Sequence, residues 1–445
     1  MPKRVAVVGA GLAGLSAAYE LERAAVEFDV YEASGRSGGI VKTSTRDGYI
    51  VEHGADSWIA NKPWLQELAG EIGMESEVVA SPAISPSTWI LRGGKLLPLP
   101  QGMRLFVPGD LKAVQDSELF SAETKRRFRE EAEARFEPAP AAEESVAEFA
   151  ERHFGREVVE VLAGPLLAGV YGGDASRLSA EAVIPGVVEM ERQHGSLIKA
   201  VQAAPGRAPA EGIFRTFGRG MQSFTDALAE RIPKSRLHVG VHVIRVLRKA
   251  SGYSLVTTRG AALGEEYDAV VMSVPVQSVA GMLDLALPKV EYSSAATVAL
   301  GYPGTLELPA GFGFLAAQGE PGIVMAATFV HQKWPWRVPL GKAMLRAFVG
   351  DPKWLAAPDG ALVLGVQDEL RSVLGIRVDP VFAIVDRWPN SMPQYEMGHR
   401  AKVEQIREAV ADFGSVFLAG NAYEGVGMPD AVRSGREAAR AAAQA

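Results

Sequence analysis

The chain has 445 residues, of which 47% are hydrophobic and 22% charged, with a net charge of −7 and no cysteine. The chain is too long for one compact core, and its length predicts about two or three domains. Its negative charge argues against a nucleic-acid partner. The lack of cysteine excludes disulfides, iron–sulfur clusters, thiolate zinc sites and a cysteinyl link to a flavin, and the seven histidines show no metal-ligand spacing, so no metal site is expected.

The predicted elements change in kind along the chain. The patterns predict a strand, a helix and a strand, then charged helices, then a region of strands, and finally a helix preceded by an apolar strand and a glycine-rich turn. The first strand, helix and strand span residues 4–8, 12–24 and 28–32. The helical segments span residues 111–137 and 146–204, the strand-rich segments 238–274 and 295–349, and the last helix begins at residue 429. Because a second nucleotide-like turn lies near the C-terminus, we expect one discontinuous domain that the chain leaves and re-enters. No clean run of 18 apolar residues occurs, so a membrane span is not expected.

The first strand and helix are joined by a dinucleotide-binding pattern, G-x-G-x-x-G, formed by Gly9, Gly11 and Gly14. The first glycine permits the tight turn, the second lets the backbone approach a pyrophosphate, and the third lets the helix pack against the sheet. The helix N-terminus then offers free N–H groups to the phosphates. Glu32 ends the second strand, and its carboxylate can accept hydrogen bonds from ribose hydroxyls. The alternative is a glycine-rich turn without a ligand.

A second glycine pair follows in the stretch EASGRSGG, which contains Ala33, Arg36, Gly38 and Gly39. These glycines would let another backbone segment reach the pyrophosphate, with Arg36 as its counter-charge. Dehydrogenases that bind NAD lack this second pair, so it favours FAD. The alternative for Arg36 is a solvated loop arginine.

Longer motifs then carry a family resemblance. EASGRSGGIVKTSTRDGYIVEHGADSW is similar to flavoproteins of the amine-oxidase superfamily, and ESVAEFAERHFGREVVEVLAGPLLAGVYGGDASRLS, EMERQHGSLI, RWPNSMPQY and GNAYEGVGMPDAVRSG narrow the likeness. Together they resemble the oxygen-dependent protoporphyrinogen/coproporphyrinogen oxidases over nearly the whole chain. The resemblance implies an α/β fold of the multi-domain α+β kind, with a discontinuous Rossmann-like FAD domain, a mixed-sheet substrate domain and a helical insertion.

The resemblance also implies how the chain is divided. The FAD domain would take residues 1–85, 205–294 and 385–445, the substrate domain 86–100 and 295–384, and the helical insertion 101–204. The insertion would wall the substrate cavity. The glycine-rich turn near the C-terminus would return the chain to the FAD domain and aim a helix N-terminus at the pyrimidine side of the flavin.

The family likeness implies further cofactor-binding residues. Residues 54–57 would contact the ribityl chain and ring, Val243 the adenine end, and Trp388 the isoalloxazine, while residues 426–428 would line the ring. These residues are Gly54, Ala55, Asp56, Ser57, Val243, Trp388, Val426, Gly427 and Met428. From the residues alone, Val243 could be a buried strand valine and Trp388 core packing.

Substrate-binding residues also follow from the resemblance. Backbone carbonyls near the reactive flavin face would meet pyrrole N–H groups, and apolar side chains would clamp a flat macrocycle. The residues implied are Gly169, Val170, Tyr171, Phe312, Leu315 and Phe348. Composition alone favours ordinary core packing for the apolar ones.

One departure from the family pattern concerns the substrate carboxylates. Some members have an arginine where this chain has Ser87 and Thr88. Carboxylate anchoring would then come from Arg92, Lys95 or Arg215, and the sequence does not choose among them. His194, His331 and His399 could be structural, surface or active-site residues, and a surface position is the default expectation.

The activity implied is FAD-dependent oxidation of a porphyrinogen to a porphyrin in heme biosynthesis, with non-covalent FAD and with O2 reduced to hydrogen peroxide. This chemistry depends on position and on a dry cavity, so no catalytic acid or base is expected, because the flavin N5 takes the hydride. Coproporphyrinogen III is slightly favoured over protoporphyrinogen IX as the substrate. An amine or carotenoid flavin oxidoreductase, or a flavin- or porphyrin-binding protein without turnover, are the other hypotheses.

The same likeness suggests a location and partners. We expect a cytoplasmic protein whose helical insertion touches the inner face of the membrane peripherally. A porphyrinogen and O2 are the expected small-molecule partners, and hand-off of the product to ferrochelatase is a further suggestion of the resemblance.

Overall fold

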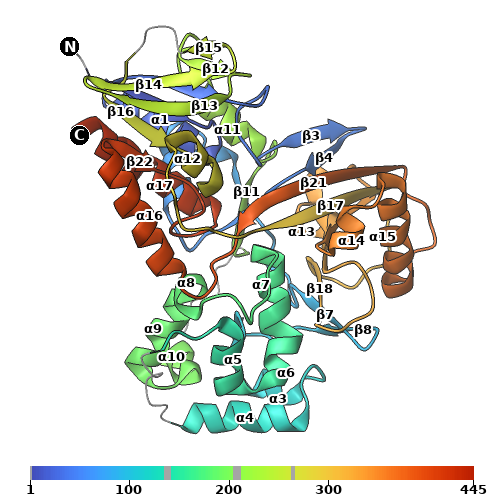
Figure 1. Cartoon of the computed structure of the whole chain (residues 1–445). Helices are drawn as coiled ribbons and strands as arrows, with labels where there is room; N and C mark the ends of the chain where they lie inside the picture. Colours follow the sequence, from blue (N-terminus) through green and yellow to red (C-terminus); the bar gives the residue numbers. More distant parts are fainter. Residues whose placement is uncertain (1–2, 135–141, 204–211, 262–265) are drawn as a thin grey trace.

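A computed structural model of the chain describes residues 3–134, 142–203, 212–261 and 266–445. The predicted domain boundary at residues 204/205 lies outside the described residues. Figure 1 shows three regions: a parallel sheet with its helices at one end, a helical region at the other, and a large mixed sheet between them to one side.

The first region is built on a five-stranded parallel sheet. Its order is β12 (Leu237–Val239), β2 (Glu27–Glu32), β1 (Arg4–Val8), β16 (Ala269–Met272) and β22 (Val416–Leu418). Helices cover both faces, which is why the central strands are apolar throughout. Val5 and Val7 pack with α1 (Leu12–Arg23), α2 (Trp64–Glu71), α11 (Gln222–Ala229) and α17 (Met428–Gln444). Ala6 and Val8 pack with α12 (Val276–Leu283) and α16 (His399–Phe413).

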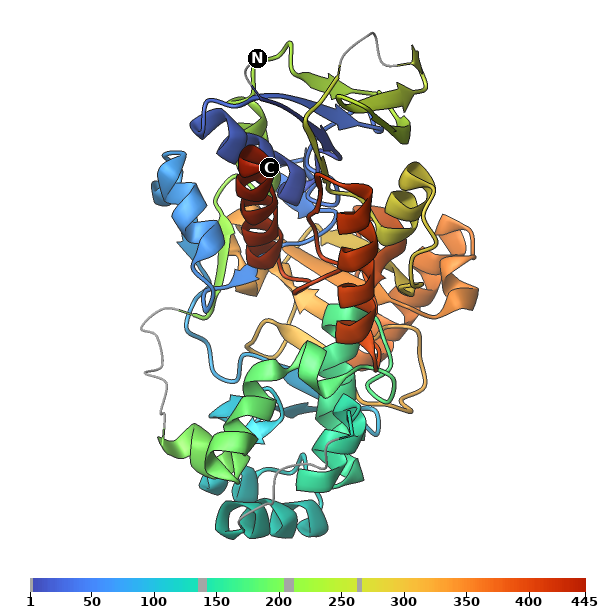
Figure 2. The same ribbon diagram turned by 60° about the vertical axis from the view of Figure 1, so that its left-hand side comes forward.

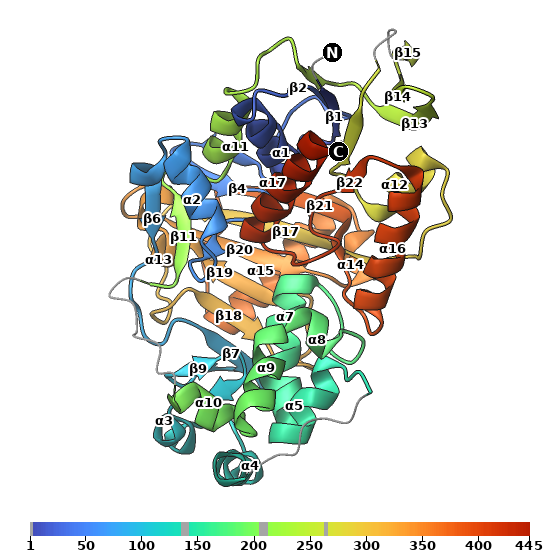
Figure 3. The same cartoon turned by 90° about the vertical axis from the view of Figure 1, so that its left-hand side faces the viewer.

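The N-terminal and C-terminal segments meet in this region. Helix α17 packs along α1, where the backbone of Gly435 lies so close to α1 that an added Cβ would be 2.1 Å from the Ala13 carbonyl oxygen. Figure 3 shows the two helices side by side beneath the sheet. The C-terminal strand and helix therefore complete the sheet that the first residues begin, as the repeated nucleotide-like turn predicts.

The second region is a seven-stranded mixed sheet. Its order is β21 (Phe382–Pro393), β17 (Tyr292–Tyr302), β20 (Ala343–Val349), β19 (Ala326–Phe329), β18 (Gly313–Ala316), β7 (Trp89–Arg92) and β8 (Lys95–Pro98). Only β18 and β7 pair in parallel. Alternate residues of β20 face opposite sides, so Leu345 and Ala347 pack with α15 (Asp359–Leu374), whereas Arg346 and Phe348 line a cavity. The predicted boundaries at 294/295 and 384/385 fall inside β17 and β21, and the division into domain segments stays a prediction.

The third region is helical and has its own apolar core. Its elements are α3 (Leu111–Asp116), α4 (Ala122–Glu133), α5 (Val146–Phe154), α6 (Arg156–Val158), a π-helical turn η2 (Val159–Ala163), α7 (Gly164–Tyr171), α8 (Ala180–Val183), α9 (Pro185–His194) and α10 (Leu197–Ala203). Figure 2 shows them gathered below the two sheets. The segment predicted to be helical from residue 111 to 137 forms α3 and α4 over its described residues, because Ser121 caps a new helix by accepting a hydrogen bond from the Thr124 N–H.

Short elements connect these regions. They are the hairpin β3 (Thr43–Arg46) and β4 (Tyr49–Glu52); the sheet of β5 (Trp58–Ile59), β11 (Phe214–Phe217) and β6 (Val78–Ala80); the sheet of β13 (Val243–Lys249), β14 (Gly252–Thr257) and β15 (Gly260–Ala261); the pair β9 (Met103–Arg104) and β10 (Val107–Pro108); and η1 (Glu75–Glu77), α13 (Val330–Lys333), η3 (Pro335–Arg337) and α14 (Pro352–Leu355). Within the described ranges no helix has the length and apolarity needed to cross a bilayer.

Candidate cofactor and substrate site

The turn between β1 and α1 has a shape that only glycine permits at two positions. Gly9 has a φ of +98°, and a Cβ there would lie 2.3 Å from the Ser273 carbonyl oxygen. A Cβ at Gly14 would lie 1.8 Å from the Gly9 carbonyl oxygen, so this glycine lets α1 start directly against the turn. At Gly11 the space is open, with nothing nearer than 4.0 Å. The backbone at Gly11 is therefore accessible to a ligand, as the fingerprint predicts.

Glu32 joins this turn to the loop that follows β2. Its Oε2 accepts a hydrogen bond from the Ala10 N–H and its Oε1 accepts one from the Ser34 N–H, both at 2.8 Å. Ala33 is exposed beside it. The N–H of Val241 donates to the Glu32 carbonyl, so the chain reaching Val243 at the start of β13 runs past the same end of β2. The predicted ribose and adenine residues thus lie at one edge of the parallel sheet.

The second glycine pair lies against the first turn. Gly11 and Gly38 form a backbone bridge, and the Gly38 N–H donates to the Ala10 carbonyl at 2.7 Å. Gly39 has a φ of +58°. The Arg36 guanidinium folds back and donates to the carbonyls of Ser37, Gly39 and Val41. In this structure Arg36 therefore holds the glycine loop in shape, in addition to any charge that it offers a phosphate.

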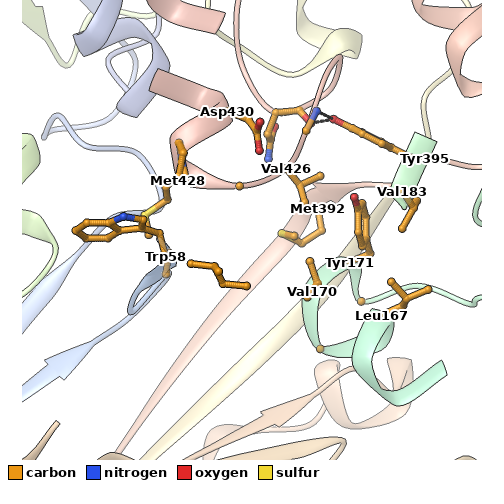
Figure 4. Close-up of a pocket in the computed structure, with 18 of the residues that line it drawn as sticks. Trp58, Leu167, Val170, Tyr171, Val183, Met392, Tyr395, Val426, Met428 and Asp430 are labelled. Carbon is orange, nitrogen blue, oxygen red and sulfur yellow. Dashed lines mark hydrogen bonds between the residues drawn. The ribbon is translucent and has the colours of Figure 1, made fainter. Parts of the chain in front are cut away.

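A cavity of about 1080 Å³ lies between the three regions. Twelve of the predicted site residues line it, with Ile40 and Trp58 beside them: Gly54, Ala55, Asp56, Ser57, Gly169, Val170, Tyr171, Phe348, Trp388, Val426, Gly427 and Met428. Figure 4 shows Val170 and Tyr171 facing Trp58 and Met428 across this space. Val170 is 52% exposed although it is apolar, which fits a side chain that faces a ligand.

Two predicted substrate residues lie behind the cavity wall and do not line it. Leu315 packs behind α7, where its Cδ2 lies 3.8 Å from the position of a Cβ on Gly169. Phe312 is buried and packs edge-on against Phe214, with the ring centroids 6.1 Å apart. Phe214 lines the cavity in its place. Phe312 and Leu315 are therefore not among the described residues that line the cavity, and their contact with a macrocycle stays a prediction.

The N-terminus of α17 points into the cavity, since Gly427 is its N-cap residue and Met428 and Pro429 begin it. No side chain caps it. Asp430 is buried in the first turn and pairs with Lys62, whose Nζ lies 2.7 and 2.6 Å from its two oxygens. The loop before the helix is fixed by Tyr395, whose hydroxyl accepts from the Gly425 N–H at 2.8 Å, as Figure 4 shows. Free helix N–H groups at a cavity favour a ligand with partial negative charge.

A buried ionic cluster lies under residues 53–57 and was not predicted from the sequence. Lys333 from α13 lies 3.1 Å from Asp56 Oδ2, and Arg346 from β20 donates to the carbonyls of His53 and Gly54. Burial alone would raise the pKa of the Asp56 carboxyl, but the charges of Lys333, Arg346 and Arg337 outweigh it and hold that pKa well below its usual range. Asp56 is thus an anion with a structural partner. The basic stretch HQKWPWR gives the only sequence signal for this cluster.

The carboxylate anchors proposed from the sequence lie elsewhere. Arg92 donates to Glu157 and to the Leu119 carbonyl, and Lys95 is exposed on β8. Arg215 donates to the carbonyls of Gly212 and Phe214. None of these three side chains is among the described residues that line the cavity.

The surface position expected for His399 is also wrong. Its ring is only 2% exposed and stacks on Tyr395, with the centroids 3.9 Å apart. Burial lowers the pKa of His399 to about 4, so the imidazole is neutral at physiological pH. His399 begins α16 at the cavity wall, and tertiary packing decides that it is buried. The local sequence does not show this packing.

These residues fit a flavin dinucleotide. The open backbone at Gly11 with the facing Gly38 and Gly39 suits a pyrophosphate, and Glu32 lies at the position that suits a ribose. The cavity beyond them has flat apolar walls and an uncapped helix N-terminus. A cavity of this size lies at the upper end of the roughly 300–1,000 Å³ of small-molecule sites, which leaves room for a second flat ring.

The fold and the site together define a flavin-dependent oxidoreductase. Residues 12–443 match the family described as flavin containing amine oxidoreductase, and the chain belongs to that family. It is 32% identical to a coproporphyrinogen III oxidase of Bacillus subtilis, over 98% of this chain and 97% of that one, and 32% identical to one of Staphylococcus aureus, over 99% and 98%. A solved structure from Exiguobacterium sp. 255-15 superposes with a TM-score of 0.90 at 29% identity, covering 99% of both chains. The predicted fold class and flavin-dependent enzyme class are thereby confirmed.

Proposed function

We propose that the chain is an oxidase that binds FAD non-covalently and converts coproporphyrinogen III to coproporphyrin III in heme biosynthesis, passing electrons to O2 and releasing hydrogen peroxide. The observation that carries this proposal is the likeness to two coproporphyrinogen III oxidases over essentially the full length of both chains. It extends beyond the cofactor-binding turns to the helical region and the mixed sheet, which provide the remaining walls of the cavity.

The adenosine half of FAD would bind at the sheet edge and its ring in the cavity. Gly11 and Gly38 would receive the pyrophosphate, Glu32 the ribose, and the backbone near Val243 the adenine. Residues 54–57, Trp388 and residues 426–428 would surround the ring, because they line the cavity together. The chain has no cysteine for a thioether link, which supports non-covalent binding.

The chemistry that a bound flavin supplies is acceptance of a hydride from a carbon that bridges two pyrroles. The chain itself would position the macrocycle. At the end of α7 the Ala168 carbonyl accepts from the Gly172 N–H, and the Tyr171 carbonyl accepts from Ser293 Oγ and Gln394 Nε2. Gly169 and Val170 therefore have the last-turn carbonyls that we assign to pyrrole N–H groups. The Val170 and Phe348 side chains would pack on the ring faces and exclude water.

The alternative substrate is protoporphyrinogen IX, because the EMERQHGSLI stretch in α9 and α10 resembles enzymes of that type. The two differ in charge: coproporphyrinogen III has four propionates, and protoporphyrinogen IX has two propionates and two vinyls. We favour the former because both full-length relatives named above act on it by name.

The test is anaerobic reduction of the bound flavin by each purified porphyrinogen in a stopped-flow instrument. Coproporphyrinogen III should bleach the flavin at least about tenfold faster, a difference of about 1.4 kcal/mol in barrier. Admitting O2 should restore the oxidised spectrum with one hydrogen peroxide per two electrons. Faster reduction by protoporphyrinogen IX would reverse the substrate assignment. Reduction by amines and by neither porphyrinogen would refute the proposed function.

A further inference from the structure

The charged side chains around the cavity are unevenly distributed. Near α16 and α17 each cation has its own carboxylate, and one more carboxylate, Glu404, lines the wall there. The pairs are Lys62 with Asp430, Arg400 with Glu181, and Arg407 with Glu424. Under residues 53–57 the balance is reversed, since two cations, Lys333 and Arg346, face the cavity with a single carboxylate, Asp56. We call these three residues the cationic floor.

Both cations of the floor are buried and tightly held. Lys333 is 7% exposed, and its Nζ lies 3.1 Å from Asp56 Oδ2 and from Ser57 Oγ and 4.3 Å from the centre of the Phe214 ring. Arg346 is 5% exposed. One of its terminal nitrogens donates to two backbone carbonyls, but its Nε is buried with no hydrogen-bond partner among the described residues.

Two further pairs of titratable groups lie behind the floor. Arg337 lies 2.9 Å from Glu52, and both side chains are almost wholly inaccessible. His53 lies 2.7 Å from Asp386. Neither pair lines the cavity, whereas both cations of the floor do. A buried cation of this kind interacts strongly with any anion that enters, because little water screens the two charges.

We propose that the cationic floor, formed by Lys333, Arg346 and Asp56, is a binding site for one negative charge in the cavity. The chemistry that suits it is a delocalised monoanion in contact with a guanidinium and an ammonium. Two groups could supply that charge: the flavin ring once it has accepted electrons, or a carboxylate of the substrate. The second source rests on the proposed function, whereas the first needs only the flavin that the family uses.

The experiment compares Lys333→Met with Lys333→Arg and with a control, Lys353→Met, on an exposed turn away from the cavity. Lys333→Met leaves Asp56 without its ammonium, so Lys333→Gln, whose amide can still donate to Asp56, is made as well in case the Met variant fails to fold. On each flavin-loaded protein two quantities are measured. One is the midpoint potential of the flavin, by equilibration with a reference dye and without any porphyrin. The other is the affinity for coproporphyrin III and for its tetramethyl ester.

If the flavin ring is the anion, Lys333→Met should weaken binding of the reduced relative to the oxidised flavin about tenfold, which lowers the midpoint potential by about 30 mV for a two-electron couple. Lys333→Arg should keep the wild-type potential. If a substrate carboxylate is the anion, the potential should stay constant and the preference for the free acid over the ester should fall about tenfold. A wild-type potential and an unchanged acid preference in Lys333→Met, or in Lys333→Gln if only that variant folds, would overturn the inference. Because the potential is read without porphyrin, a failure of the proposed function leaves that measurement interpretable.

Discussion

At the scale of single residues, Glu32 connects the two loops that would hold the adenosine half of FAD. Its carboxylate already accepts from Ala10 and Ser34, and a ribose would add a charge-assisted hydrogen bond. We expect Glu32→Ala to weaken FAD binding by roughly 1.5–3 kcal/mol. Titration of the apoprotein with FAD measures this change, and Glu27→Ala, at the exposed start of the same strand, should leave the affinity unaltered. Equal affinities of the two variants would contradict the ribose assignment.

Gly169 lines the cavity, and its surroundings leave room for a side chain. A Cβ there has only Leu315 Cδ2 as a neighbour, at 3.8 Å, so Gly169→Leu should fold and keep its flavin while filling the cavity. Displacement from near-attack geometry can reduce a rate on the order of 10²-fold. Anaerobic flavin reduction by coproporphyrinogen III should therefore slow about a hundredfold, with Gly360→Leu, at an open position on α15, as control. A variant as fast as that control would move the substrate away from α7.

At the scale of elements, four helices of the insertion meet at one buried imidazole. His153 on α5 has its Nδ1 3.2 Å from Glu131 on α4 and its Nε2 3.0 Å from Glu191 on α9. Glu131 also accepts from the N–H groups of Leu197 and Ile198, which begin α10. This cluster thus joins the outer helices to the helices of the insertion that wall the cavity, which include α8 and α9.

This cluster gives the insertion a pH dependence. Burial alone would lower the pKa of His153, but the hydrogen bonds and charges of Glu131 and Glu191 outweigh it, so that pKa is raised. A group whose pKa is higher in the folded state stabilises that state fully at a pH below its unfolded pKa, about 6.5. The contribution is lost as the pH rises through the folded pKa. We expect the urea midpoint of the wild type to fall as the pH rises from about 6 through the raised pKa of His153.

The check is a set of urea titrations of wild type, His153→Gln and His242→Gln across that range. His242 is exposed, so its variant should follow the wild type, whereas His153→Gln should be less stable at low pH and nearly independent of pH above 6. A parallel fall in all three proteins would attribute the pH dependence to other groups.

The elements also show which features a sequence can predict. The glycines at 9, 11 and 14 act through chain neighbours, since the turn, the strand and the helix are contiguous, and the structure has the geometry that their spacing indicates. The same holds for the strand, turn and helix at the C-terminus. The cationic floor has no such local signal, because Asp56, Lys333 and Arg346 come from three distant segments. Phe312 and Leu315 are absent from the cavity lining for a related reason, since tertiary packing decides which side chains reach the cavity.

At the scale of the whole molecule, the candidate FAD site is assembled from segments that are far apart in the chain. The fingerprint turn, residues 54–57, the chain before β13 and the N-terminus of α17 surround it. A ligand that touches all of them joins the parallel sheet to the mixed sheet through residues 53–57, which Arg346 and Trp388 hold by hydrogen bonds to their carbonyls. Cofactor binding and global stability should therefore be coupled.

Removal of the cofactor should destabilise the whole chain, and the pattern of rescue should identify the nucleotide. A ligand that binds only the folded state at a thousand times its Kd stabilises by about 4 kcal/mol, so FAD should raise the thermal midpoint of the apoprotein by several degrees. ADP offers the turn and Glu32 a pyrophosphate and a ribose, whereas FMN offers the cavity a ring without the adenosine half. We expect FAD to stabilise most, ADP at saturating concentration to stabilise measurably, and FMN to stabilise less than ADP.

Scanning calorimetry of the apoprotein with each nucleotide at equal concentration measures these shifts, with NAD as the control for a dinucleotide that lacks a flavin. A shift of the thermal midpoint with FMN equal to that with FAD would mean that the fingerprint turn does not bind the adenosine diphosphate. A shift with NAD equal to that with FAD would mean that the ring cavity does not select the flavin.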